Sequence, residues 1–248
     1  MTIGSPQDIE GLRAAGQAVA QTLKKMMARA RPGMTTAELD ALGAELLAGY
    51  GARSAPELCY GFPGATCISI NEEAAHGVPG DRVLREGDVV NVDVSAELDG
   101  YFADTGGSFL MPEAGAEMER LCAATMRARD TAVAEVRAGR PLNFIGRAIQ
   151  QTARREGFKL LRNLGSHGVG TTLHEEPRFI PPYFDPNDER TLHEGQVITI
   201  EPFLSTRASQ VTEGGDGWTL TGPRKNRSAQ YEHTMIVTKE EPVVVTEA

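Results

Sequence analysis

The sequence contains few cysteines, and no apolar stretch in it is long. Its only cysteines are Cys59, Cys67 and Cys122, and no two of them form a CxxC pair. An odd number of cysteines without such a pair predicts neither a disulfide framework nor a thiolate zinc site, so we expect reduced thiols. No segment approaches the roughly 20 apolar residues that a membrane helix needs, and the first residues do not have the pattern of a signal peptide. These absences predict a cytoplasmic protein without a membrane partner.

Positive charge is also scarce. The chain has 25 Lys and Arg against 34 Asp and Glu, which gives a net charge of −9. This balance argues against a protein dedicated to binding nucleic acids or anionic membranes. A hydrophobic content of 40% and a charged content of 24% are those of an ordinary globular protein. Some of the surplus acids are therefore available to bind cations.

One segment of ten residues has a second, similar copy later in the chain. Residues 84–93 read LREGDVVNVD and residues 192–201 read LHEGQVITIE, an offset of 108 residues. In both copies an apolar, β-branched run ends in a carboxylate, Asp93 in the first and Glu201 in the second. An ionised carboxylate on a buried strand is costly unless a cation accompanies it. The repeat therefore predicts two related acidic sites.

Each copy of the segment is followed by a second acid. Asp104 follows the first copy and Glu232 follows the second, so that four carboxylates occur as two related pairs. We expect Glu201 to end a strand and Glu232 to lie within one. Asp99 and Gly100 are typical of a hairpin turn, which would pair Ser95 with Asp104. Asp93 would then lie on the same face as Asp104, with the two Cα atoms about 7 to 8 Å apart.

Helices are expected in the same order in both halves. Capping residues and apolar periodicity predict that they begin near Pro6, Thr35, Glu117 and Leu142, with the last two ending near Val136 and Glu156. No linker rich in Ser and Gly separates the halves. We therefore expect one domain over residues 1–248, with halves of roughly 1–110 and 111–248. Its predicted class is α+β, with helices packed outside a curved, mostly antiparallel sheet.

The four acids have the chemistry of a metal site. Divalent Mn, Fe, Co and Zn accept carboxylate oxygens and imidazole nitrogens, and four negative charges would balance two such ions. His167 is the best candidate for an imidazole ligand, because the surrounding GSHGVG lets the backbone approach a ligand closely. Taken alone, an acid on a strand is more often a surface residue, and a loop histidine is more often structural. The duplication is what favours a site over these simpler explanations.

The chain resembles a known family, the type I (bacterial-type) methionine aminopeptidases, which have the pita-bread fold. The resemblance extends from Ile3 to Val245. Its motifs are SINE at 69–72 with His76-Gly77, NVD at 91–93 with Asp104-Thr105, HGVG at 167–170 with HEEP at 174–177, TIEP at 199–202, DGWT at 216–219 and QYEHT at 230–234.

The resemblance implies a role for each residue at the site. Asp93 would bind a first divalent ion, Asp104 and Glu232 would bridge two ions, and His167 and Glu201 would complete the second site. His76 and His174 would be catalytic residues that hydrogen-bond the substrate and the tetrahedral intermediate, and Glu201 would also carry a proton. The pocket for the substrate side chain would contain Phe62, Cys67 and Trp218, besides the two catalytic histidines.

The implied activity is the removal of the initiator methionine from nascent proteins whose second residue is small, by attack of a metal-bridging hydroxide on the scissile carbonyl. The partners would be peptides with an N-terminal methionine and the ribosome, which the basic segment 224–227 would approach, and a monomer is expected. Asn71 and Ser228 match positions that hold a monovalent cation in relatives. Two alternatives are an Xaa-Pro aminopeptidase of the same fold, which usually carries an added domain, and a metal-free binding protein.

The chain departs from the family pattern at the rim of the expected pocket. The family usually has Tyr-His-Gly, an aromatic residue and Pro where this chain has Cys59-Tyr60-Gly61-Phe62-Pro63. The residues before the proposed metal histidine, Gly165-Ser166, also differ from the common Cys-Gly. None of these departures affects a proposed metal ligand, so the rim is where we expect this chain to differ.

Overall fold

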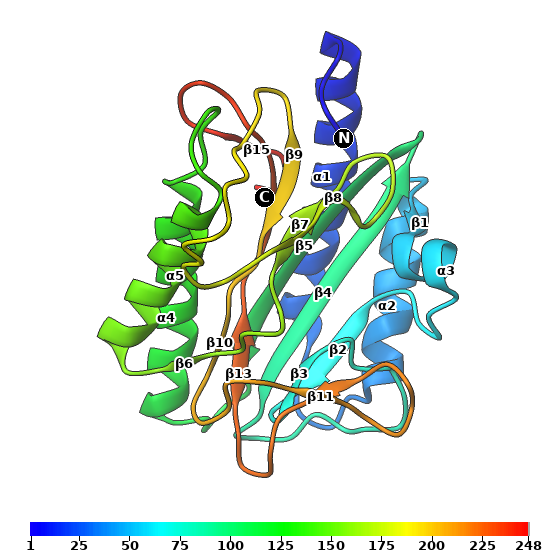
Figure 1. The fold of residues 1–248 in the computed structure, drawn as a ribbon. Helices are drawn as coiled ribbons and strands as arrows, with labels where there is room; N and C mark the ends of the chain where they lie inside the picture. The colour runs from blue at the N-terminus through cyan, green and yellow to red at the C-terminus, as the bar shows by residue number, and fades with distance from the viewer. Residues whose placement is uncertain (248) are drawn as a thin grey trace.

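The computed structural model describes residues 1–247, in which strands form the centre and helices cover the outside (Figure 1). Helices α1 (Pro6–Arg29) and α2 (Thr36–Gly49) pack on the strands of the first half, and α4 (Ala116–Val133) and α5 (Asn143–Glu156) pack on those of the second. The α+β class is therefore confirmed. Each helix within the described residues is too short or too polar to cross a lipid bilayer.

The first half begins with two helices that both start with a capping box. The Ser5 and Thr35 side chains accept hydrogen bonds from the backbone three residues later, and the acids at those later positions, Asp8 and Glu38, bond back to the cap residues. This satisfies backbone N–H groups that the first helical turn leaves without partners. The remaining elements of this half are β1 (Arg53–Ser54), α3 (Ala55–Tyr60), β2 (Cys67–Ile70), β3 (Glu73–Ala75), β4 (Val89–Leu98) and β5 (Tyr101–Leu110).

The second half has two helices followed by short strands. The helix expected from Glu117 to Val136 is α4, and its expected end is wrong, because α4 ends at Val133. After Val133 the chain forms turns, in which Val136 N donates to Val133 O. The strands are β6 (Lys159–Leu160), β7 (Ser166–Gly168), β8 (Glu175–Ile180), β9 (Val197–Ile200), β10 (Phe203–Ser205), β11 (Thr212–Glu213), β12 (Leu220–Thr221), β13 (Ser228–Gln230), β14 (His233–Ile236) and β15 (Val243–Val244).

The strand pairs between these elements are antiparallel. Rather than one continuous sheet, the described residues form four hydrogen-bonded sheets, with orders β1-β4-β2 joined by β5 on β4, β15-β14-β9-β7-β8, β13-β10-β6 and β11-β12-β3. The first two carry most of the paired strands. The division arises because several strands are interrupted where the chain turns from one sheet into the next.

The β4–β5 hairpin has the expected register. Asp99 and Gly100 form its turn with φ angles of 51° and 88°, and Ser95 faces Asp104 across the strands. Alternate residues of β4 point to opposite faces. The apolar set, which packs against α1 and α2, consists of Val90, Val92, Val94 and Ala96. Asp93 and Ser95 point the other way and line a cavity on the inner face of the sheet.

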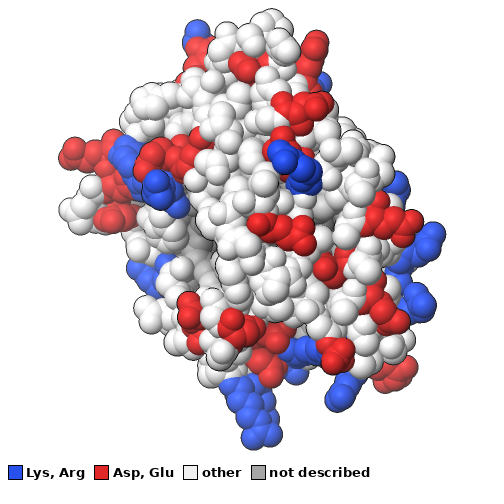
Figure 2. All heavy atoms as spheres, turned by 90° about the vertical axis from the view of Figure 1, so that its right-hand side faces the viewer, with Lys and Arg blue, Asp and Glu red and all other residues white. Residues whose placement is uncertain are grey.

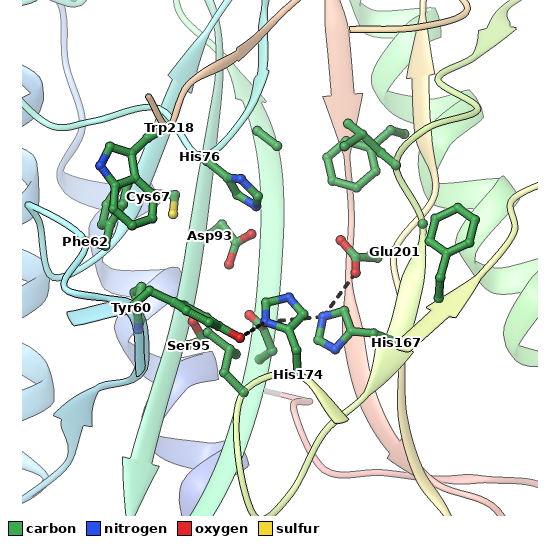
Figure 3. A pocket seen from close by; sticks show the side chains of 18 of the residues that line it. Tyr60, Phe62, Cys67, His76, Asp93, Ser95, His167, His174, Glu201 and Trp218 are labelled. Carbon is green, nitrogen blue, oxygen red and sulfur yellow. Dashed lines mark hydrogen bonds and ion pairs between the residues drawn. The ribbon is translucent and has the colours of Figure 1, made fainter. Parts of the chain in front are cut away.

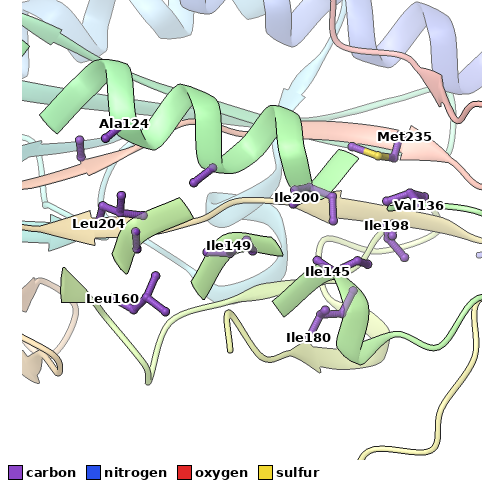
Figure 4. Packing of buried hydrophobic residues seen from close by; sticks show 14 of the residues in the cluster. Ala124, Val136, Ile145, Ile149, Leu160, Ile180, Ile198, Ile200, Leu204 and Met235 are labelled. Carbon is purple, nitrogen blue, oxygen red and sulfur yellow. The ribbon is translucent and has the colours of Figure 1, made fainter. Parts of the chain in front are cut away.

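In the core of the second half, strand side chains likewise pack against two helices (Figure 4). On β9, Ile198 and Ile200 pack against residues of α4 and α5 such as Ala124 and Ile145. Burying an aliphatic side chain of this size contributes about 1.5–3 kcal/mol. Because strand residues alternate, Thr199 and the following Glu201 lie on the opposite face, as Asp93 does on β4.

Matching hydrogen bonds link the duplicated segments to the turns before them. Gly33 N donates to Leu84 O at 2.8 Å, and Gly139 N donates to Leu192 O at 2.7 Å. Both glycines have positive φ angles, 92° and 79°, which explains why glycine occurs at each. Both copies of the repeated segment are therefore held to the preceding turn by the same hydrogen bond.

The two halves meet at Glu232. The expectation that Glu232 lies within a strand is wrong, since it lies between β13 and β14, where the chain passes from one sheet to another. Its backbone N–H donates to Gly106 O at 2.9 Å, and its carbonyl accepts from the Thr105 hydroxyl at 2.9 Å. These bonds fix Glu232 against β5 of the first half.

Charged side chains of both signs are mixed on the face that carries α2 and α3, where acidic and basic groups lie close to one another (Figure 2). Elsewhere, ion pairs such as that of Lys239 with Glu194 lie at the surface. The four acids of the repeat differ from these surface acids, because they point into the molecule.

The close approach of β5 to Glu232 gives a testable prediction. A Cβ at Gly106 would clash with the Gln230 carboxamide, which is fully buried and bonded to Asn91 and Glu232. We expect Gly106→Ala to lower the free energy of unfolding by about 1–3 kcal/mol in urea titrations. Gly107→Ala is the matched control, since its Cβ would lie 3.5 Å from the Met27 sulfur. Equal stability of the two variants would contradict this packing.

Candidate metal centre and substrate pocket

The proposed ligands from both halves converge at one place. Atoms of Asp104, His167 and Glu232 lie within 4.8 Å of one another. His167 Nε2 lies 3.3 Å from Glu201 Oε1 and 3.9 Å from Asp104 Oδ2. Asp93, on the neighbouring strand, lines the same cavity as Asp104, His167 and Glu201. The structure therefore brings all five predicted ligands together, with His167 between acids of the two halves.

Two of these carboxylates have an oxygen without a partner. Within residues 1–247, Asp104 Oδ1 and Glu232 Oε1 are buried and accept no hydrogen bond. The other Glu232 oxygen accepts from Gln230 Nε2 at 2.9 Å, and Glu201 Oε1 accepts from the Thr199 hydroxyl at 3.2 Å. Buried acceptors without partners are costly, so these free oxygens indicate that the site is built for cations.

The protonation of the cluster reflects its burial and its like charges. Burial, and then the neighbouring acids, raise the pKa values of Asp104, Glu201 and Glu232 well above their usual range, and burial raises the pKa of Asp93 to about 6. No Arg or Lys within residues 1–247 forms an ion pair with these four acids. A divalent cation would supply the missing positive charge, so the residues fit such a metal.

His167 has the form that a metal ligand needs. Burial, and then the nearby His174, lower its pKa to about 3, so the ring is neutral at neutral pH. Its Nδ1 lies 2.9 Å from Gly168 O, an arrangement in which Nδ1–H donates to that carbonyl and Nε2 keeps a free lone pair. Nε2 is also the nitrogen that faces Glu201 and Asp104. A backbone carbonyl that fixes the ring in this way is typical of metal-binding histidines.

The two other predicted histidines lie beside the acids (Figure 3). The ring of His174 lies 4.1 Å from that of His167, measured between centroids, and His76 lines the same cavity near Asp93. His76 has a φ angle of 53°, and a Cβ at the next residue, Gly77, would clash with Ile68 O. The tight backbone at this point explains the His-Gly pair.

An apolar region adjoins the acids in a cavity of about 410 Å³. Phe62 and Trp218 meet edge to face with their ring centroids 5.2 Å apart, and Cys67 pairs with Asp93 across β2 and β4. Burial, and then Asp93, raise the pKa of the Cys67 thiol, which therefore remains uncharged. All three predicted pocket residues thus lie where one end of a substrate could be apolar while the other meets acids.

Some residues of the site were not predicted from the sequence as site residues. Gln230 and Thr199 hydrogen-bond to Glu232 and Glu201, and the Tyr60 hydroxyl lies 2.8 Å from His174 Nδ1. Gln230 and Thr199 lie two residues before these acids, a spacing that places them on the same face of an extended chain. That spacing could have revealed both, whereas the contact of Tyr60 joins residues far apart in the sequence.

Because no cation pairs with the buried carboxylates, we can predict how the stability of metal-stripped protein depends on pH. Glu232 has a raised pKa when folded, so its contribution to stability is present at low pH and is lost as pH rises. We expect Glu232→Gln to be more stable than wild type at pH 8, by about 1.4 kcal/mol for each unit by which the pKa is raised, and less so at pH 5.5. Urea unfolding at both pH values measures this.

Glu240→Gln, at an exposed position, is the matched control and should not change stability at either pH. With a divalent metal added, the order should reverse, because the glutamine variant lacks one anionic ligand. A metal-stripped Glu232→Gln protein that is less stable than wild type at pH 8 would show that the acids do not repel one another.

Comparisons with known proteins agree with this geometry. The sequence model of Metallopeptidase family M24 matches residues 10–239. The chain is 44% identical over 247 residues to the protein named methionine aminopeptidase 2 from Bacillus subtilis (strain 168), covering 99% of each chain. The crystal structure of a methionine aminopeptidase from Thermotoga maritima has a TM-score of 0.95 at 32% identity, and the match covers 100% of both chains.

A more distant structure helps to decide between the alternatives. A prolidase from Pyrococcus furiosus has a TM-score of 0.79 at 20% identity, and this chain covers 66% of it. That likeness shows the pita-bread fold alone and does not favour an Xaa-Pro peptidase. The full-length similarity to proteins named methionine aminopeptidase confirms the resemblance seen in the motifs. The chain therefore belongs to metallopeptidase family M24.

Proposed function

We propose that the protein is a metal-dependent aminopeptidase that removes an N-terminal methionine when the second residue is small. The observation that carries this proposal is the convergence of Asp93, Asp104, His167, Glu201 and Glu232, with two buried oxygens left free, beside an apolar cavity. The full-length similarity to proteins named methionine aminopeptidase supports the proposal. A metal-free binding protein would gain nothing from burying four acids without partners.

The five converging residues would hold two divalent cations per chain. Asp93 would bind one ion, His167 and Glu201 the other, and Asp104 and Glu232 would bridge them, with their free oxygens available for this. When bound, such ions supply Lewis acidity that polarises a carbonyl and lowers the pKa of water. Because four of the five ligands are carboxylates, Mn or Fe is favoured over Zn.

The chain's own residues would then move protons and orient the substrate. The Glu201 carboxylate is aligned by the Thr199 hydroxyl and can take a proton at one oxygen and pass it to the leaving amine. His76 and His174 line the cavity beside the acids and would donate N–H groups to the substrate carbonyl as it gains negative charge.

The pocket explains why an N-terminal methionine would be selected. Phe62, Cys67 and Trp218 offer an apolar wall of aromatic edge and sulfur, which suits an unbranched thioether side chain. Divalent ions held by the neighbouring carboxylates would attract the lone pair of a free α-amine, which only the first residue of a peptide has. The combination of a metal-binding end and an apolar end therefore favours exopeptidase action.

Several further features belong to the same proposal. Residues 1–248 would form one catalytic domain that acts as a cytoplasmic monomer on nascent proteins, with the basic segment 224–227 facing the ribosome. The Asn71 carbonyl accepts a hydrogen bond from Ser228 N at 3.2 Å, so these two residues are neighbours and would provide oxygens to a monovalent cation.

The direct test is peptide cleavage by metal-stripped protein titrated with Mn, Fe, Co and Zn. We expect release of methionine from a Met-Ala peptide once metal is added, and no release of the first residue from an Ala-Pro peptide. Free amino acids measured by mass spectrometry report both reactions. Cleavage of the Ala-Pro peptide alone would instead identify an Xaa-Pro peptidase, and no cleavage with any metal would favour a binding protein.

Glu201→Ala tests the proposed proton transfer by Glu201 in the same assay. We expect a loss of turnover of about 10²- to 10⁴-fold while the protein stays folded by circular dichroism. Glu194→Ala is the matched control, because Glu194 lies in the same repeated segment but pairs with Lys239 at the surface. Near-wild-type turnover by Glu201→Ala would remove Glu201 from the mechanism.

A further inference from the structure

Tyr60 contacts a catalytic histidine from the rim of the cavity. Its hydroxyl lies 2.8 Å from His174 Nδ1, and the two rings are tilted by 52° with their centroids 5.6 Å apart. Figure 3 shows the Tyr60 hydroxyl directed at the His174 ring, with His167 and Glu201 beyond that ring. Tyr60 is also a residue at which this chain departs from the family motif.

The backbone holds Tyr60 firmly although its side chain is 49% exposed. Tyr60 is the last residue of α3, a short helix capped at both ends. The Ser54 hydroxyl accepts a hydrogen bond from Glu57 N at its start, and Gly61, with a φ of 69°, closes its end through a bond to Glu57 O. Capping limits fraying of the last turn, so the hydroxyl is kept within reach of His174.

The protonation of the pair determines which group donates. Partial burial, and then the neighbouring Cys59, raise the pKa of the Tyr60 hydroxyl, so it keeps its proton at neutral pH. A neutral imidazole carries one N–H and one nitrogen with a free lone pair. Within residues 1–247 the Tyr60 hydroxyl has His174 Nδ1 as its hydrogen-bond partner. If the hydroxyl donates to Nδ1, the ring proton must reside on Nε2.

We propose that Tyr60 is a positioning residue, which holds His174 in the tautomer and orientation whose Nε2–H donates to the scissile carbonyl oxygen of the substrate. This inference rests on the proposed aminopeptidase function. Nε2 has no hydrogen-bond partner within residues 1–247, and His174 lines the cavity, so that N–H is free for a substrate. A second group that fixes the ring of a catalytic histidine is the arrangement that makes such a donor effective.

The test is Tyr60→Phe, which keeps the ring and removes only the hydroxyl. With metal added and a Met-Ala peptide as substrate, we expect kcat to fall by about five- to tenfold, the effect of one hydrogen bond, with little change in KM. Tyr50→Phe is the matched control, since the Tyr50 hydroxyl accepts from Lys25 at the surface and is not part of the site. That variant should keep wild-type kcat.

A second readout follows the histidine itself. In metal-stripped protein labelled with ¹⁵N-histidine, the NMR shifts of His174 should show an unprotonated Nδ1 and a protonated Nε2. In Tyr60→Phe the Nδ1 shift should move toward that of a ring without a partner, while Tyr50→Phe leaves it unchanged.

Three outcomes would overturn the inference. Wild-type kcat in Tyr60→Phe would do so, and so would a lower kcat without any change in the His174 shifts, because the loss would then come from the shape of the rim. A wild-type protein that cleaves no methionine peptide with any metal would instead disprove the proposed function and, with it, the positioning role of Tyr60. An active wild type with an unaffected variant would disprove only the role of Tyr60.

Discussion

The structure depends on one electrostatic constraint: four carboxylates lie together inside the protein, and no Arg or Lys within residues 1–247 pairs with them. Asp104, Glu201 and Glu232 are 5%, 7% and 1% exposed, and two of their oxygens have no partner. An arrangement of this kind disfavours folding unless cations balance it. The neutral imidazole of His167 and the apolar pocket are useful only if such cations are present.

The duplicated architecture explains how the protein tolerates this constraint. Each half has two helices packed on the outer face of its strands, with the aliphatic side chains of β4 and β9 on that face and the acids on the other. The two cores stabilise the strands from outside, while the inner faces meet at the metal centre. The acids come from both halves, so the two halves must keep a fixed position relative to each other. The bonds of Glu232 to Gly106 and Thr105 do this directly.

The sequence predicted what local patterns encode and failed where the contact is between distant segments. Asp99-Gly100 fixed the hairpin register because a two-residue turn leaves one way to pair the strands, and this placed Asp93 and Asp104 on one face. The repeat identified Glu201 by its equivalence to Asp93. The strand position expected for Glu232 was wrong, because a chain that crosses between sheets looks locally like a continuous strand. The contact of Tyr60 with His174 spans 114 residues, and no periodicity could indicate it.

The most direct test of the metal centre is a crystal structure of the protein soaked with Mn²⁺, analysed by anomalous scattering. Bijvoet differences locate manganese independently of how the protein atoms are placed. We predict two adjacent peaks inside the molecule, surrounded by Asp93, Asp104, His167, Glu201 and Glu232, with ligands from both halves at the shared positions. Peaks found only at surface acids, or an interior cluster without anomalous signal at saturating manganese, would contradict the claim that these buried carboxylates exist to bind metal.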